Sequence, residues 1–282
     1  MGRSKGFSLN LNGNLINLQK PVVMGILNVT PDSFYDGGKY FGEADILRQA
    51  EKILSEGALI LDIGAYSTRP NAPEVSAEEE WKRLNWALSM IKNRFPDAYI
   101  SIDSFRAEIV RRAKADFDIA MVNDISGGTL DGKMFETVAE LQLPYVLMHT
   151  AGNPQTMQKH TNYDNLLESI MLFLAEKVEK LKLLGVNDII IDPGFGFAKN
   201  LEQNYELLAS LKEFKIFDLP LLVGLSRKSM FYKLLDISPQ ESLNATTVGN
   251  TLALLGGANI LRVHDVKEAV EAVRIVEKMK EI

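Results

Sequence analysis

The chain has 282 residues, a formal net charge of -6 and 46% hydrophobic residues, a composition typical of a globular protein. The acidic balance argues against sequence-independent binding of nucleic acid, and the absence of cysteine excludes disulfides, thiolate chemistry and cysteine-bound zinc. No apolar run reaches the ~18 residues of a membrane span. No apolar signal core follows the first six residues, so we expect a cytoplasmic protein without a membrane partner.

The first predicted element is a β-hairpin over residues 7–18. Apolar and polar residues alternate on both sides of Asn12-Gly13-Asn14. An Asn-Gly pair is a strong signal for a tight hairpin turn. We expect this hairpin to have a structural role at the bottom of the domain that follows.

Eight strands then alternate with helices. The predicted strands cover residues 22–29, 58–64, 99–103, 119–124, 144–149, 189–192, 220–225 and 259–263. The predicted helices cover residues 43–57, 77–93, 106–115, 133–141, 163–184, 201–214, 228–235, 239–255 and 266–280. Eight β-then-α units over roughly 250 residues indicate an α/β fold, a single (β/α)₈ TIM barrel, and a doubly wound open sheet is the alternative. Since no linker divides the chain, we expect one domain over residues 1–282, with the hairpin in 1–20 and the barrel in 21–282.

Three predicted connections are longer than a tight turn, namely residues 30–42, 67–76 and 150–162. All three follow the carboxyl end of a strand, which is the face where barrel active sites lie. Long loops at this face often close over ligands. The sequence therefore predicts a site at this end of the barrel.

Polar side chains stand at the carboxyl ends of the predicted strands, and a barrel brings those ends around one mouth. They are Asn28, Asp62, Asp103, Asn123, Asp124, His149, Asp192, Ser226, Arg227, Lys228, Arg262 and His264. A structural role, as an ion pair or a brace of the rim, is an open alternative for four of them: Asp62, Asp124, His149 and Arg227. Asn28, Asp192 and Lys228 are harder to explain in that way, because each lies between an apolar strand and a loop of the predicted mouth.

The residue types suggest a substrate. Asp103, Asn123 and Asp192 can form paired hydrogen bonds with an amino-substituted heterocycle. Arg69, Arg262 and His264 can hold a phosphate, for which the end of the last strand is a frequent site in barrels. We therefore expect a substrate with a neutral ring and an anionic leaving group.

Six short motifs follow one another along nearly the whole chain: residues 24–34 (MGILNVTPDSF), 67–70 (STRP), 123–125 (NDI), 192–197 (DPGFGF), 226–229 (SRKS) and 262–265 (RVHD). Together they resemble the dihydropteroate synthase family, the sulfonamide target of folate biosynthesis. The resemblance implies a transferase that joins p-aminobenzoate to 6-hydroxymethyl-7,8-dihydropterin pyrophosphate through a carbocation-like step. The products are 7,8-dihydropteroate and pyrophosphate.

The resemblance also implies roles for individual residues. Three are expected to be catalytic while holding the pterin: Asp103, Asp192 and Lys228. The pterin pocket is completed by Asn123, Ile125 and Met148. Pyrophosphate is expected to bind at Asn28, Arg262 and His264, and Asn28 is also the expected Mg²⁺ ligand. The p-aminobenzoate pocket is expected to comprise Phe34, Thr68, Arg69, Pro70, Phe197 and Ser229.

Further expectations from the family are a homodimer and small-molecule substrates as the only other partners. The chain departs from the common family pattern at Tyr66, Asn71, Thr150 and Ala198, which all lie in predicted loops. We expect these differences to change loop geometry and the response to sulfonamides rather than the reaction.

Two other functions compete with this interpretation. A pterin-dependent methyltransferase domain has a similar fold, but it needs neither a pyrophosphate site nor a Ser-Thr-Arg-Pro loop. Arg69 together with Arg262 and His264 therefore disfavours it. A non-catalytic pterin-binding protein would not require two long loops and a metal ligand.

Overall fold

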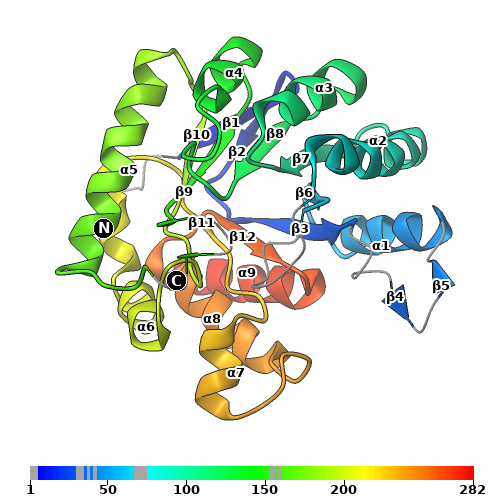
Figure 1. Cartoon of the computed structure of the whole chain (residues 1–282). Helices are drawn as coiled ribbons and strands as arrows, with labels where there is room; N and C mark the ends of the chain where they lie inside the picture. Colours follow the sequence, from blue (N-terminus) through cyan, green and yellow to red (C-terminus); the bar gives the residue numbers. More distant parts are fainter. Residues whose placement is uncertain are drawn as a thin grey trace.

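The computed structural model describes residues 6–29, 35–36, 39–40, 43–66, 75–152, 156–157 and 160–282. Eight parallel strands form one sheet in the order β10-β9-β8-β7-β6-β3-β12-β11 (Figure 1). The strands are β3 Val22–Asn28, β6 Ile60–Gly64, β7 Tyr99–Asp103, β8 Met121–Asp124, β9 Tyr145–Met148, β10 Ile189–Asp192, β11 Leu222–Val223 and β12 Ile260–Val263. The sheet curls into a barrel, because Ile191 of β10 forms a parallel bridge with Leu221 at the other edge. The barrel prediction is confirmed.

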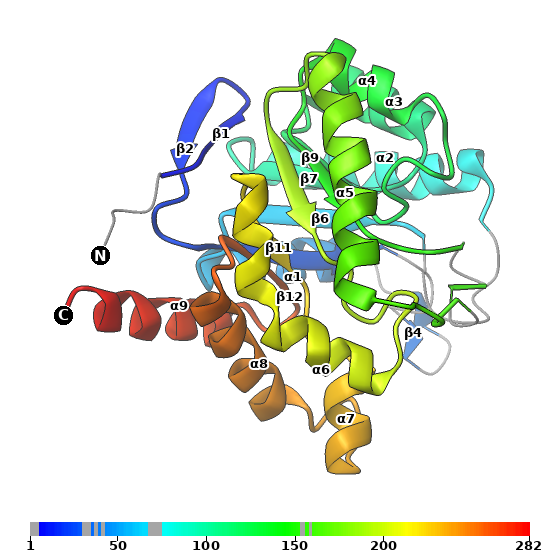
Figure 2. The same ribbon diagram turned by 90° about the vertical axis from the view of Figure 1, so that its left-hand side faces the viewer.

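Helices surround the sheet (Figures 1 and 2). They are α1 Glu43–Ser55, α2 Ala77–Arg94, α3 Ala107–Phe117, α4 Met134–Leu141, α5 Leu166–Leu183, α6 Leu201–Ala209, α7 Ser229–Leu235, α8 Leu243–Gly256 and α9 Val266–Lys280. In the described part of the chain, no helix combines the length and the apolar character needed to cross a membrane.

Two segments differ from the sequence prediction. The helix predicted over residues 201–214 ends at Ala209, and a 3₁₀ helix, η3 Leu211–Phe217, replaces its last turn. The Ser210 N–H is shared between the carbonyls of Glu206 and Leu207, which tightens the chain at that point. Within the connection predicted as a loop over residues 30–42, two short strands, β4 Tyr35–Asp36 and β5 Lys39–Tyr40, pair antiparallel.

The predicted N-terminal hairpin is present as β1 Ser8–Leu11 and β2 Asn14–Asn17. Asn12 and Gly13 both have positive φ angles, 49° and 83°, as a type I′ turn requires. Figure 2 shows the hairpin at the opposite end of the barrel from β4. Its buried leucines pack into the barrel floor, so the hairpin closes the bottom as predicted.

The strands change character along their length. Their inward-facing residues near the floor are apolar and form one core cluster with the hairpin: Met24, Ile60, Met121, Val146, Ile190, Leu222 and Ile260. Side chains two residues apart point to the same face of a strand. Two residues further on, the same strands carry Ile26, Asp62, Asn123, Met148, Asp192, Gly224 and Arg262. The fold thus places most of the predicted polar residues on one level above an apolar floor.

Candidate active site

Arg262 of β12 joins the ends of several strands. Its Nε donates to Asp62 Oδ2 at 2.7 Å, and its Nη2 donates to Asp103 Oδ2 at 2.5 Å. Asn123 Nδ2 donates to the same Asp62 oxygen at 3.0 Å. One network therefore connects β6, β7, β8 and β12, and the ion pair expected for Asp62 is present.

Burial and charge both act on this network. Burial raises the pKa of Asp103 to about 7, although Arg262 opposes the shift, and the neighbouring Asp62 adds to it. Burial disfavours the charge on Arg262, but Asp62 and Asp103 outweigh this effect and raise the pKa of Arg262 above its ordinary value. Burial thus makes the Asp103 carboxyl easier to protonate than an exposed aspartate, and the ion pair with Arg262 favours its charged form.

Asp192 and Lys228 form a second group in the mouth. Asp192 is 7% exposed, and its Oδ1 accepts a hydrogen bond from the Gly194 N–H at 2.7 Å. The Lys228 ammonium donates to the Phe195 carbonyl and lies 4.8 Å from the centroid of the Phe197 ring. Burial raises the pKa of Asp192 against the effect of Lys228, and burial lowers the pKa of Lys228 to about 8 against the effect of Asp192.

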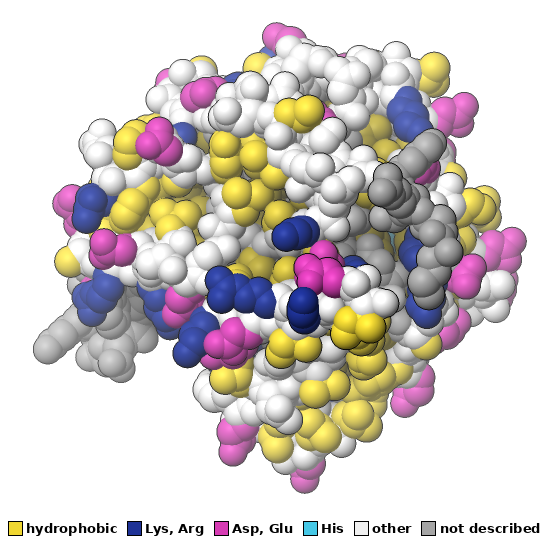
Figure 3. Space-filling view, turned by 180° about the vertical axis from the view of Figure 1, so that it is seen from behind, with side chains coloured by type: hydrophobic (Ala, Val, Ile, Leu, Met, Phe, Trp, Pro, Cys, Tyr) yellow, Lys and Arg dark blue, Asp and Glu magenta, His cyan; other side chains and the backbone are white. Residues whose placement is uncertain are grey.

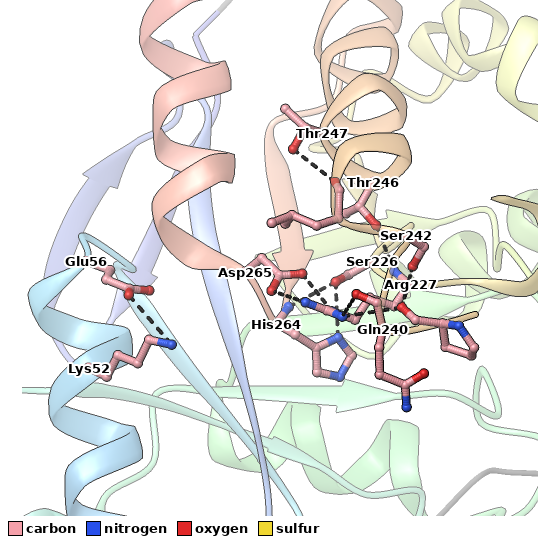
Figure 4. A network of polar contacts seen from close by, with 12 residues as sticks. Lys52, Glu56, Ser226, Arg227, Gln240, Ser242, Thr246, Thr247, His264 and Asp265 are labelled. Atoms are coloured by element: carbon pink, nitrogen blue, oxygen red, sulfur yellow. Dashed lines mark hydrogen bonds and ion pairs between the residues drawn. The ribbon is translucent and has the colours of Figure 1, made fainter. Parts of the chain in front are cut away.

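The rim next to this group is built by the loops after β11 and β12 (Figure 4). The His264 N–H donates to Ser226 Oγ at 3.2 Å, and His264 Nδ1 lies 3.1 Å from the same oxygen. Arg227 has a left-handed backbone, with φ 54°, and donates to both oxygens of Asp265 at 2.7 and 2.9 Å. Of the two interpretations of Arg227, the structural ion pair is therefore the one that is present.

Asp124 also has a structural arrangement. It is fully buried and accepts hydrogen bonds from the backbone of Ser126 and Gly128 and from the Tyr145 hydroxyl. These contacts join the end of β8 to the loop that follows it and to β9. They brace the barrel, which is the structural alternative that the sequence left open.

His149, which directly follows β9, is 3% exposed and contacts a lysine that was not predicted from the sequence. His149 Nδ1 lies 3.1 Å from Lys199 Nζ. Burial, and then the charge of Lys199, lower the pKa of His149 to about 2, so its ring is neutral at physiological pH. Burial lowers the pKa of Lys199 to about 7, whereas Asp192 raises it. The one feature of the sequence that could have pointed to Lys199 is its position directly after the apolar, glycine-rich residues 194–198.

The other predicted residues fall into two groups. Ile125 and Met148 are 6% and 3% exposed, yet neither belongs to the two core clusters formed by the described residues, as expected for side chains that line the mouth. Asn28 is half-buried at the end of β3, and Ser229 begins α7. The remaining four lie outside the described residues: Phe34, Thr68, Arg69 and Pro70.

Comparisons with known proteins identify the family. The family described as pterin binding enzyme matches residues 24–264. Dihydropteroate synthase of Escherichia coli K12 is 45% identical over 267 residues, which cover 94% of each chain. The chain belongs to the dihydropteroate synthase family of pterin-binding enzymes. Dihydropteroate synthase of a Synechocystis strain is 43% identical over 93% of this chain and 91% of its own length.

Solved structures agree with this assignment. Dihydropteroate synthase of Yersinia pestis, in a complex with a sulfonamide drug, has a TM-score of 0.91 and 42% identity and covers 98% of this chain and 100% of its own. The Xanthomonas albilineans enzyme with 4-aminobenzoic acid has a TM-score of 0.91 and 33% identity and covers 99% of this chain and 100% of its own. The family resemblance and the barrel fold are both confirmed.

Proposed function

We propose that this chain joins p-aminobenzoate to 6-hydroxymethyl-7,8-dihydropterin pyrophosphate, forming 7,8-dihydropteroate and releasing pyrophosphate. Membership of the family is the first support. The observation that carries the proposal for this chain is the mouth itself, where Asn123, Asp103 and Arg262 belong to one polar network and Asp192 lies close enough to Lys228 and Arg262 for their charges to act on it. The acids and the amide suit the pterin, and Arg262 next to them suits its anionic leaving group.

The buried acids are proposed to bind the pterin and to favour the developing cation. Breaking the bond to pyrophosphate leaves positive charge on the methylene carbon and the ring. Asp103 and Asp192, shielded from water, act on that charge more strongly than they would in solution. Ile125 and Met148 supply the apolar walls of this pocket.

Arg262 and His264 are proposed to bind the pyrophosphate. Asp62 and Asp103 hold the Arg262 side chain in one position. Ser226 Oγ lies 3.1 Å from Nδ1 of His264 and so holds the orientation of the imidazole ring. Such preorganised groups stabilise negative charge on the departing group without reorientation.

Asn28 is proposed to be the protein ligand of Mg²⁺. Among the described residues no group of three or more acidic or histidine side chains could hold a metal on its own. A site with one amide oxygen at the end of β3 fits Mg²⁺, which usually takes one or two protein ligands together with phosphate oxygens and water. When bound with substrate, the ion would neutralise charge on the leaving pyrophosphate.

The second substrate is proposed to bind between Phe197 and Ser229 and the residues Phe34, Thr68, Arg69 and Pro70. Phe197 lies against the Lys228 ammonium, so a ring placed next to it would be close to the pterin pocket. The relative from Xanthomonas albilineans was solved with 4-aminobenzoic acid and the one from Yersinia pestis with a sulfonamide. We infer that both ligand types would compete for this pocket.

One assay tests the reaction. Pyrophosphate release by the purified protein should require both p-aminobenzoate and the pterin pyrophosphate. Methyl transfer from methyltetrahydrofolate to a corrinoid, without pyrophosphate release, would indicate the methyltransferase alternative. Pterin binding without either reaction would indicate a binding protein.

Mg²⁺ should tighten the binding of a pyrophosphorylated pterin much more than that of bare pterin, and equal effects would remove Asn28 from the metal site.

We further propose that the protein is a cytoplasmic homodimer. Apolar side chains gather at the end of the molecule where α7 and α8 lie (Figures 1 and 3). They include Leu234, Leu235, Val248, Leu252 and Leu255, all exposed. Exposed apolar patches of this kind mark contact surfaces. Light scattering should give twice the mass of the 31.4 kDa chain.

A further inference from the structure

Lys199 is a buried cation for which the reaction described above has no use. Its side chain lies beneath the loop of residues 193–198 that follows β10, and the residue is 3% exposed. Nζ donates to the carbonyls of Gly194 and Phe197 at 2.8 and 3.0 Å and lies 3.1 Å from His149 Nδ1. An ammonium group has three donors, and here each has a partner.

A buried ammonium is costly, since burial disfavours its charge even when it is hydrogen-bonded. Lowering of the Lys199 pKa reflects that cost. A methionine or leucine would fill the same volume without it. The three partners of the ammonium group belong to this loop or to the end of the neighbouring strand β9. We therefore explain the buried charge by the link that it makes between the loop and this strand end.

Two other side chains, from α6 and from the segment before α5, hold the same loop. The Tyr163 hydroxyl donates to the Ala198 carbonyl at 3.0 Å, and the Gly196 N–H donates to Asn204 Oδ1 at 2.7 Å. At Gly194, which has φ 75°, a Cβ atom would lie 2.0 Å from the His149 carbonyl oxygen. The loop is thus pressed against β9, and Lys199 and His149 bridge that contact.

The same loop also contacts Lys228 of the mouth. There the Phe195 carbonyl accepts a hydrogen bond from Lys228, and the Phe197 ring lies against the same ammonium group. Asp192, in contrast, belongs to β10, which is paired with β9, although its Oδ1 also accepts a hydrogen bond from the Gly194 N–H of the loop. The shape of the loop therefore determines where Lys228 and Phe197 stand, whereas the sheet holds the backbone of Asp192.

We propose that Lys199 is a positioning residue, which together with His149 fixes the loop of residues 193–198 and through it the Lys228 ammonium and the Phe197 ring. The inference deepens the proposed function and rests on it. It predicts a separation of effects. Losing the contacts that Lys199 makes with the loop and His149 should impair p-aminobenzoate use and turnover, which depend on Phe197 and Lys228. The pterin site on the strands should stay nearly intact.

Lys199→Met tests this, because it keeps the length of the stem and removes the three donors. We expect kcat to fall at least ~10-fold and KM for p-aminobenzoate to rise at least ~10-fold, since a misplacement of about 1 Å can cost 100-fold. The Kd for bare pterin, measured by calorimetry, should change less than about threefold because the strands remain in place. Lys182→Met, which alters an exposed lysine of α5, is the matched control and should leave all three constants unchanged.

Three outcomes would overturn the proposal. In the first, folded Lys199→Met protein has kcat and KM close to those of the unchanged protein. In the second, pterin affinity falls as much as turnover, so that Lys199 supports the whole mouth. In the third, only the melting temperature falls, which is the result of a purely structural role. Absence of pyrophosphate release by the unchanged protein would instead refute the proposed function.

A milder pair of variants covers the case in which Lys199→Met does not fold. His149→Leu removes one acceptor and leaves the ammonium its two carbonyls. His149→Asn places an oxygen close to the position of Nδ1. We expect His149→Leu to raise KM for p-aminobenzoate by more than His149→Asn does, with pterin affinity again nearly constant. Equal kinetic constants for the two variants would refute the role of His149 and Lys199 in fixing the loop.

Discussion

The floor and the mouth of the barrel are made by the same strands and differ in chemistry. On β6, Ile60 faces the floor and Asp62 the mouth, and on β12 the corresponding pair is Ile260 and Arg262. The floor residues pack against Leu11 of the hairpin and its neighbours. A step of two residues, about 7 Å along a strand, therefore separates a core from a cluster of buried charges.

This difference separates stability from function. Apolar side chains in the floor gain free energy on burial. Buried charges in the mouth must be compensated by partners, and the raised pKa of Asp103 and the lowered pKa of Lys228 show that the compensation is incomplete. Substitutions in the mouth should thus change binding and rate, and substitutions in the floor should change stability alone.

The largest effect is expected for Asp192→Asn. Loss of a buried carboxylate that pairs with a polar ligand edge should weaken pterin binding by ~2–5 kcal/mol. The melting temperature should not fall, because the amide oxygen can still accept the Gly194 N–H. Calorimetry with bare pterin measures the effect, with the exposed Asp97→Asn as control. Unchanged affinity in folded Asp192→Asn would remove this residue from the site.

Lys228→Met should lower the rate of pyrophosphate release at least ~100-fold, as deletion of a positioned hydrogen-bond donor does. Its methionine keeps an apolar stem against Phe197, so the fold should survive. Binding of bare pterin should weaken less than the rate does. Lys233→Met, an exposed position of α7, is the control. A rate close to that of the unchanged protein would assign Lys228 to the rim and contradict its catalytic role.

The floor is tested by Leu11→Ala. Leu11 is fully buried, but it belongs to a hairpin that can relax at the edge of the barrel, so we expect a loss of about 2 kcal/mol in the free energy of unfolding. Leu15, 75% exposed on the other strand of the hairpin, provides the control Leu15→Ala. Urea unfolding gives the free energies. A large fall in kcat for folded Leu11→Ala would show that floor and mouth are not separate.

The smallest effect concerns pH. His149 has a pKa lowered to about 2 in the folded protein, against an ordinary value of 6.5. The unfolded chain therefore binds the proton first, and this contribution to stability is present above pH 6.5 and is lost as pH falls. His149→Asn should thus make unfolding less sensitive to acid, by about 1 kcal/mol between pH 7 and pH 5.5. Parallel curves for the two proteins would show that His149 is not held neutral.

The strands and their polar ends could be predicted because both follow from local patterns. The run of three isoleucines before Asp192 and the Asn-Gly turn at Asn12 each specify their own conformation. The end of α6 could not be predicted in this way, because its last turn tightens into a 3₁₀ helix without a break in the apolar pattern.

Side-chain contacts between residues far apart in the sequence could not be predicted from the sequence. Sequence left Asp124 and Arg227 each with two interpretations, and only the contacts with Tyr145 and Asp265 decide between them. Lys199 was missed altogether, because a lysine after a glycine-rich loop is usually solvated. Its burial depends on packing between residues that are 50 positions apart in the sequence.

The ion pairs of Arg262 also have a consequence for how the molecule forms. They connect residues 200 and 159 positions apart, and β12 must enter between β3 and β11 before either can exist. A chain released from the ribosome without its last strand would hold Asp62 and Asp103 together with no cation between them. Closing the barrel and completing the site are thus the same late event of folding, because contacts this distant form only after the rest of the chain is available. Nascent and truncated chains should consequently be inactive even where most of their helices and strands have formed.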